Sequence, residues 1–146
     1  MFTLRLRNWL FLSAFAGLAL GSCSKKDDAQ PVTPTSATTQ QLATSGSWRL
    51  DEITQNSQVS SSGAGIKDRY SLKFRADGTY SQTLLADNTT YNGTWMLMSN
   101  NTVLDFTDHK GANSEYTISS VSGTALRYRF TNKTNQTEEL GFSAQP

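Results

Sequence analysis

The sequence contains one histidine and one cysteine, His109 and Cys23, so its capacity for acid–base or metal chemistry is small. Asp108 precedes His109 and could orient it as a general base, but acyl transfer also needs an activated serine, and the chain has no Gly-x-Ser-x-Gly motif. His109 has no second His or Cys to complete a metal shell. Glu138 and Glu139 are adjacent on an expected strand, so their side chains leave opposite faces. We expect no enzyme activity, no metal site and no cofactor.

The five tyrosines are the residues best suited to hold a ligand. A buried tyrosine has an apolar ring and a hydroxyl that seeks a partner, which suits a small apolar or amphipathic molecule. If the fold is open at one end, we predict that these residues bind such a ligand; if the interior is filled, they are core side chains. They are Tyr70, Tyr80, Tyr91, Tyr116 and Tyr128.

The charge balance excludes one class of partner. The 13 Lys and Arg nearly cancel the 12 Asp and Glu, and the net charge is +1. Because charge-driven binding to a phosphate backbone needs a concentrated positive field, we expect no nucleic-acid partner.

The N-terminus has the pattern of an export signal. Arg5 and Arg7 precede an apolar run over residues 9–20, and the first acidic residue is Asp27. A helix of these 12 residues reaches only about 18 Å, against about 30 Å of bilayer hydrocarbon. We therefore predict that residues 1–22 are a signal peptide.

The end of this signal carries a resemblance. Leu20-Gly21-Ser22-Cys23 resembles the lipobox of bacterial lipoproteins, which implies that Cys23 is acylated, with palmitate-type chains, and becomes the new N-terminus. Lys25, Lys26 and the two acids that follow resemble the surface-export signal of Bacteroidetes-type lipoproteins. The resemblance implies an outer-membrane lipid anchor and exposure at the cell surface.

The segment after Cys23 is polar. Residues 29–45 include two prolines, many Thr and Ser, and only Val32 and Leu42 as larger apolar residues. Such a composition buries too little surface to offset chain entropy, so we predict a flexible linker over residues 23–45 and a folded domain over residues 46–146.

Apolar residues of this domain recur with a period of two, which is typical of half-buried antiparallel strands. Turn signals such as Ala76-Asp77-Gly78 separate them and indicate consecutive hairpins. Residues 55–67 are the exception: a Ser/Gly-rich connection without apolar alternation, which we interpret as a long binding loop. The eight expected strands contain Trp48/Leu50, Tyr70/Leu72/Phe74, Tyr80/Gln82/Leu84, Tyr91/Gly93/Trp95/Leu97, Leu104/Phe106, Tyr116/Ile118, Leu126/Tyr128/Phe130 and Leu140/Phe142.

Eight up-and-down strands in about 100 residues can close into a barrel, which removes the unpaired edges of an open sheet. We therefore predict an all-β, eight-stranded antiparallel barrel rather than a sandwich. A barrel of this size is either filled by side chains or holds one small ligand.

Three segments resemble the lipocalin-like domains common in Bacteroidetes lipoproteins: Gly46-Ser47-Trp48, the stretch from Phe74 to Tyr80, and Gly93-Thr94-Trp95-Met96-Leu97. The resemblance implies that Trp48 plugs one end of the barrel, beneath Arg127 or Arg129. Trp95 stands in a similar Gly-x-Trp-x-Leu context, and we assign it to the same packing role.

Two functions follow from these observations. The first is a membrane-anchored, non-catalytic protein whose lipocalin-like barrel binds a small hydrophobic or amphipathic ligand. The second is a surface module with a filled barrel that contacts a protein or a glycan. The sequence leaves both open.

Overall fold

The computed structural model describes residues 33–44 and 46–146. The predicted signal peptide, Cys23 and the first part of the predicted linker lie outside these residues. No helix in the described part of the chain is both long enough and apolar enough to cross a membrane.

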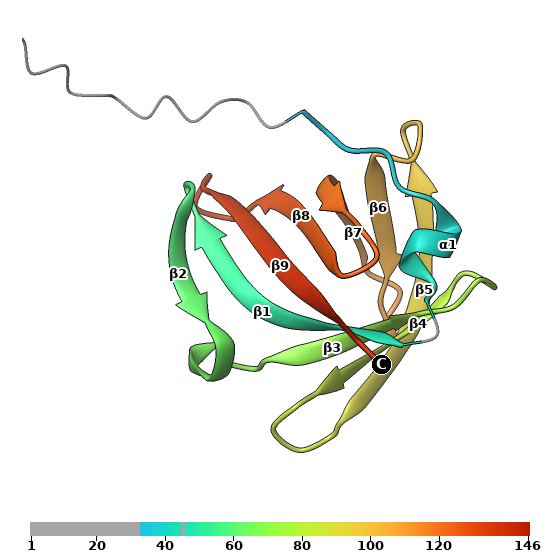
Figure 1. Cartoon of the computed structure of the whole chain (residues 1–146), viewed down its shortest axis with the longest axis horizontal. Helices are drawn as coiled ribbons and strands as arrows, with labels where there is room; N and C mark the ends of the chain where they lie inside the picture. Colours follow the sequence, from blue (N-terminus) through green and yellow to red (C-terminus); the bar gives the residue numbers. More distant parts are fainter. Residues whose placement is uncertain (1–32, 45) are drawn as a thin grey trace, which may run out of the picture.

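Eight antiparallel strands form a closed barrel, as predicted (Figure 1). Each strand pairs with its neighbour in sequence around the barrel, and pairing between the first and last strands closes it. The alternation of inward apolar and outward polar residues produces this arrangement, because successive side chains of a strand leave opposite faces. The barrel strands are β1 (Ser47–Gln55), β3 (Tyr70–Phe74), β4 (Thr79–Leu84), β5 (Thr90–Met98), β6 (Val103–Thr107), β7 (Asn113–Val121), β8 (Ala125–Thr131) and β9 (Thr137–Gln145).

The prediction of an irregular loop over residues 55–67 was wrong. This segment contains a ninth strand, β2 (Gln58–Ser62), which pairs with the second half of β1, and a short 3-10 helix, η1 (Gly63–Gly65). Asn56 and Ser57 have φ of 49° and 66° and form a two-residue turn that matches the twist of a hairpin. The strand escaped the periodicity argument because it covers no core, so its residues carry no apolar alternation.

The predicted linker also ends earlier than expected. A short helix, α1 (Thr39–Leu42), is capped by Thr38, whose hydroxyl accepts from the Gln41 N–H while the Gln41 side chain accepts from the Thr38 N–H. Leu42 is 0% exposed, and its carbonyl accepts a 2.9 Å hydrogen bond from Trp48 Nε1.

Upstream of α1 the chain also contacts the barrel. The Thr35 N–H donates to the Ile118 carbonyl at 2.8 Å, and Ala37 is buried. We call residues 35–44 the strap. The prediction of a flexible linker up to residue 45 was therefore wrong for the strap: two small or apolar side chains and a few backbone hydrogen bonds suffice to hold it.

The half of the barrel beside the strap is packed. Trp48 and Trp95 are both buried, and Trp95 Nε1 donates to the carbonyls of Arg75 and Thr79. Phe74 lies edge-on to Trp95 with a ring-centroid distance of 5.1 Å.

No arginine from β8 lies beneath Trp48. Arg127 and Arg129 alternate with the inward residues Leu126, Tyr128 and Phe130, so both lie on the outer face. Arg127 pairs there with Glu52 at 2.9 Å and Glu139 at 3.2 Å. The Trp48 indole finds its partner in the strap instead.

Candidate ligand-binding site

The barrel has a cavity at the end opposite the strap. This cavity of about 210 Å³, which we call the cup, includes residues of the β6–β7 turn, whereas the strap bonds to the β5–β6 turn at the other end of β6. Four of the five tyrosines line it, because they occupy inward positions on four different strands. The lining residues are Tyr70, Leu72, Tyr80, Gln82, Phe106, Asp108, Ala112, Ser114, Tyr116 and Tyr128.

Phe106 forms the apolar floor of the cup. Its ring lies 4.9 Å from that of Tyr80, 5.5 Å from that of Tyr116 and 6.2 Å from that of Tyr128, measured between centroids. On its other side it contacts Phe74 at 5.7 Å. The interior is thus filled by side chains on the strap side of Phe106 and hollow on the other side. The sequence left open whether the barrel is filled or hollow, and each description fits one half of it.

The four phenols of the cup stay neutral at physiological pH. Burial raises the pKa of Tyr80 and Tyr116. Burial also raises the pKa of Tyr70 and Tyr128, whose hydroxyls are hydrogen-bonded to each other. The cup therefore presents hydroxyl donors and acceptors on aromatic walls, and its tyrosines carry no charge.

Asp108 contributes a carboxylate at the edge of the cup. Its Oδ1 accepts from the backbone N–H groups of Lys110 at 2.8 Å and Ala112 at 2.9 Å. Hydrogen bonds from Ala112 and Lys110 lower the pKa of Asp108, so it stays ionised. Sequence reasoning considered Asp108 only as a partner of His109 and did not find Gln82 or Ser114, because only the barrel's curvature brings them together.

Tyr91 lies outside the cup. Tyr91 occupies the same face of β5 as Gly93 and Trp95, which is the inward face. However, it stands near the start of β5 and is 38% exposed, and its ring stacks on the exposed His109 with centroids 5.0 Å apart. The alternation of inward and outward residues predicted that Tyr91 lies with the other tyrosines. Its position along the barrel axis places it outside the cup.

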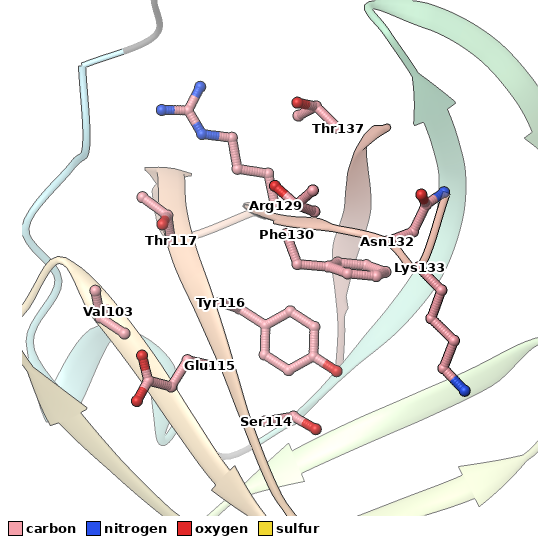
Figure 2. A pocket seen from close by; sticks show the side chains of 11 residues that line it. Val103, Ser114, Glu115, Tyr116, Thr117, Arg129, Phe130, Asn132, Lys133 and Thr137 are labelled. Carbon is pink, nitrogen blue, oxygen red and sulfur yellow. The ribbon is translucent and has the colours of Figure 1, made fainter. Parts of the chain in front are cut away.

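A second, larger hollow opens on the side of the barrel between β7 and β8 (Figure 2). This hollow of about 660 Å³, which we call the groove, shares Ser114 and Tyr116 with the cup. Figure 2 shows the rings of Tyr116 and Phe130 together in its middle, with Arg129 and Lys133 extending in opposite directions. It is lined by Val103, Ser114, Glu115, Tyr116, Thr117, Arg129, Phe130, Thr131, Asn132, Lys133 and Thr137.

Sequence reasoning did not predict the groove. Its position depends on where the pairing of β7 with β8 stops, and no local pattern encodes that point. Within the part of the chain that the structure describes, no three His, Cys, Asp or Glu side chains gather as a metal site would require.

The comparison with protein families agrees with the fold. The family model for the lipocalin-like domain matches residues 44–128, more than half of the chain. A solved structure of a redesigned β-barrel matches with 13% sequence identity and a TM-score of 0.44, covering 78% of this chain and 100% of that chain. A search of curated proteins found no match.

Proposed function

The chain belongs to the lipocalin-like domain family, and from this premise we propose that it binds a small amphipathic molecule in the cup without transforming it. The observation that carries the proposal is the convergence of four neutral phenols on one open cavity. Fold alone does not define a function, so the chemistry of these side chains has to support the binding role.

The size and lining of the cup narrow the ligand class. Sites for drug-sized molecules usually enclose about 300 Å³ or more, and the cup has 210 Å³. Aromatic walls favour a ring or a short apolar body, while the hydroxyls, Gln82 and Ser114 favour polar substituents. We infer a ligand the size of one substituted ring rather than a long acyl chain.

The titratable groups of the cup support a binding role over a catalytic one. A general acid or base works best when its pKa lies near the operating pH. The pKa of each phenol in the cup is raised above its ordinary value, and the pKa of Asp108 is lowered below its ordinary value. None of these groups is therefore tuned to take up and return a proton near pH 7.

We propose further that acyl chains on Cys23 hold the protein at the outer membrane, with the barrel at the cell surface. The lipobox-like sequence and the charged residues after it support this location. Because the strap belongs to the barrel, at most the eleven residues 24–34 are left to act as a tether between Cys23 and the strap, with a reach of at most about 40 Å.

Native mass spectrometry of the chain purified from its own membrane tests the binding proposal. We expect a reproducible small-molecule adduct in the wild type and a loss of at least tenfold in its occupancy in Tyr80→Phe/Tyr116→Phe. The matched control is Tyr91→Phe, which removes a phenol outside the cup and should retain the adduct. An adduct that survives the double substitution, or that Tyr91→Phe also removes, would contradict a site in the cup.

A further inference from the structure

The wall of the barrel has a gap where the groove lies. The ladder of β6 with β7 continues to Asn113, and the ladder of β8 with β9 continues to Thr131. In contrast, the pairing of β7 with β8 ends at Thr117–Arg129, although Glu115 would lie opposite Thr131 if this ladder continued in register. The first residues of β7 and the end of β8 therefore border an opening in the wall.

Side chains from both faces of the sheet line the groove. Tyr116 and Phe130 occupy inward positions of their strands and pack against the core. Glu115 and Thr117 flank Tyr116 in the chain and therefore leave the outer face, yet they line the same hollow. A hollow on one face of the sheet would be lined from that face alone. The groove is therefore a slit that joins the interior of the barrel to its outer surface.

The slit meets the cup at Tyr116. Ser114 and Tyr116 line both hollows. The ring of Tyr116 lies 5.5 Å from that of Phe106 in the cup and 5.3 Å from that of Phe130 in the groove, measured between centroids, and both contacts are edge-to-face. Because a single side chain separates the two hollows, a molecule made of two directly joined rings can place one ring in each.

Hydroxyl groups are the commonest polar groups of the groove. Each hydroxyl both donates and accepts hydrogen bonds, so it matches a substituent that carries hydroxyls of its own. An acyl chain would remove water from these groups without replacing its hydrogen bonds, which is unfavourable. The C–H groups of a hydroxyl-rich ring also pack on the rings of Tyr116 and Phe130. The hydroxyls belong to Ser114, Thr117, Thr131 and Thr137.

The charges at the groove select neither sign. Glu115 and Lys133 lie on opposite sides of the Tyr116 ring (Figure 2). Glu138 lies beside them, and its carboxylate accepts a 3.5 Å hydrogen bond from Asn132 Nδ2. Arg129 lines the groove as well, but it already interacts within the chain. A charged substituent would meet groups of both signs, so this balance favours an uncharged one.

We propose that the groove is a second subsite, which binds an uncharged, hydroxyl-rich substituent on the molecule whose aromatic ring occupies the cup. The ligand class is then an aryl glycoside, in which a sugar ring is joined directly to an aromatic ring. The aromatic ring lies against Phe106, and the sugar passes Tyr116 into the slit and packs on Phe130. This inference rests on the proposed function of the cup and extends it, because the cup alone holds one ring.

A pair of probes tests the proposal on the full chain by nuclear magnetic resonance titration. Phenol should shift the amides of Asp108 and Ala112 at the cup. Phenyl β-D-glucopyranoside, which adds only the sugar ring, should also shift those of Glu115 and Thr131 and should bind roughly tenfold more tightly. Phenyl β-D-glucuronide adds a carboxylate to the sugar and should bind no more tightly than the glucoside.

Two pairs of variants separate the groove from the cup. Phe130→Ala should reduce the affinity for the glucoside to about that for phenol, whereas phenol binding should stay as in the wild type. Its control is Tyr91→Ala, which removes an aromatic side chain outside both hollows. Thr117→Val replaces a hydroxyl by a methyl group and should weaken glucoside binding about threefold, while Thr94→Val on the exposed face of β5 should not. The Thr117 pair keeps the test valid if Phe130→Ala fails to fold.

The probes distinguish failure of the groove from failure of the cup. Equal binding of phenol and the glucoside, with shifts confined to the cup, would overturn this inference and leave the proposed function standing. Methyl β-D-glucopyranoside that binds as tightly as the phenyl glucoside would overturn it too, since the sugar would then bind independently of the cup. A glucuronide that binds more tightly than the glucoside would contradict an uncharged substituent. The absence of any shift with millimolar phenol or glucoside would contradict the cup and the groove together.

Discussion

The ring of Tyr80 lies directly on Gly93, its partner across β4 and β5. A Cβ atom at position 93 would come within 2.6 Å of Tyr80 Cε1 and would overlap the carbonyl oxygen of Thr107. Glycine at this position therefore lets one tyrosine of the cup lie flat against the barrel wall. The neighbouring Trp95 then fills the interior one step further along β5.

Replacing this glycine should damage both stability and the cup. We expect Gly93→Ala to lower the free energy of unfolding by about 1 to 3 kcal/mol, because the added methyl overpacks the wall and displaces Tyr80. Urea denaturation measures the loss, and Gly123→Ala, where a Cβ would meet no atom within 4 Å, is the control. Equal stability of the two variants would show that the Thr107 carbonyl and Tyr80 both move aside without cost.

Alkaline pH should unfold the protein through its buried phenols. The pKa of Tyr128 is raised in the folded state, so its stabilising contribution is present below the ordinary tyrosine pKa and is lost as pH rises above about 10. Each pH unit beyond that point should cost up to about 1.4 kcal/mol per buried phenol. Tyr128→Phe should flatten the decline measured by denaturation between about pH 9 and 11, relative to its own stability at neutral pH. An unchanged slope would contradict this assignment.

The strap should contribute to the stability of the barrel. We expect Leu42→Ala to cost about 2 to 5 kcal/mol, since it empties a fully buried site beneath Trp48. The control is Leu85→Ala, which truncates a leucine that is 41% exposed on the β4–β5 turn. Thermal unfolding distinguishes them; a Leu42→Ala protein as stable as the control would mean that the strap is dispensable.

Acid should weaken the ion cluster on the outside of β1. Burial alone would raise the pKa of Asp51, but hydrogen bonds from Arg49, Ser143 and Arg69 outweigh it and lower the pKa to about 2. The contribution of Asp51 is therefore present above about pH 4 and is lost as pH falls toward 2.

Asp51→Asn should thus cost about 1 to 2 kcal/mol near pH 7, after allowance for solvent screening, and should reduce the loss of stability between about pH 4 and 2. Urea denaturation at about pH 7, pH 4 and pH 2 measures both effects. The control is Asp68→Asn, on the exposed segment before β3. Parallel pH profiles of Asp51→Asn and wild type would contradict the assignment.

The membrane anchor is tested by Cys23→Ala. Since the thiol of Cys23 is the proposed acylation site, this substitution should leave an unacylated precursor with an uncleaved signal peptide. Intact mass measurement after membrane fractionation would detect it. A processed and acylated Cys23→Ala protein would contradict the lipobox interpretation.

Much of the fold follows from short-range patterns in the sequence. The alternation Leu126/Tyr128/Phe130 predicts an inward face on β8 because consecutive residues of a strand leave opposite sides, whatever the strand pairs with. The same argument predicted all eight barrel strands and inward positions for all five tyrosines, of which four line the cup. It failed for β2, whose residues cover no core, and for the strap, where Leu42 alone carries most of the burial.

The alternation of residues along a strand assigns each side chain to one face of the sheet, but it does not say how far along the barrel axis that side chain lies. Tyr91 and Tyr80 both occupy inward-facing positions of their strands, yet register places Tyr80 over Phe106 and leaves Tyr91 beside His109 at the rim. Likewise, the separation of Glu115 from Thr131 depends on where two strands stop pairing. Periodicity is a property of neighbours in the chain, so the sequence alone determined the strands and their inward faces. Register and curvature bring together residues that lie far apart in the chain. Only the tertiary structure therefore decided the positions of the cup, the strap and the groove.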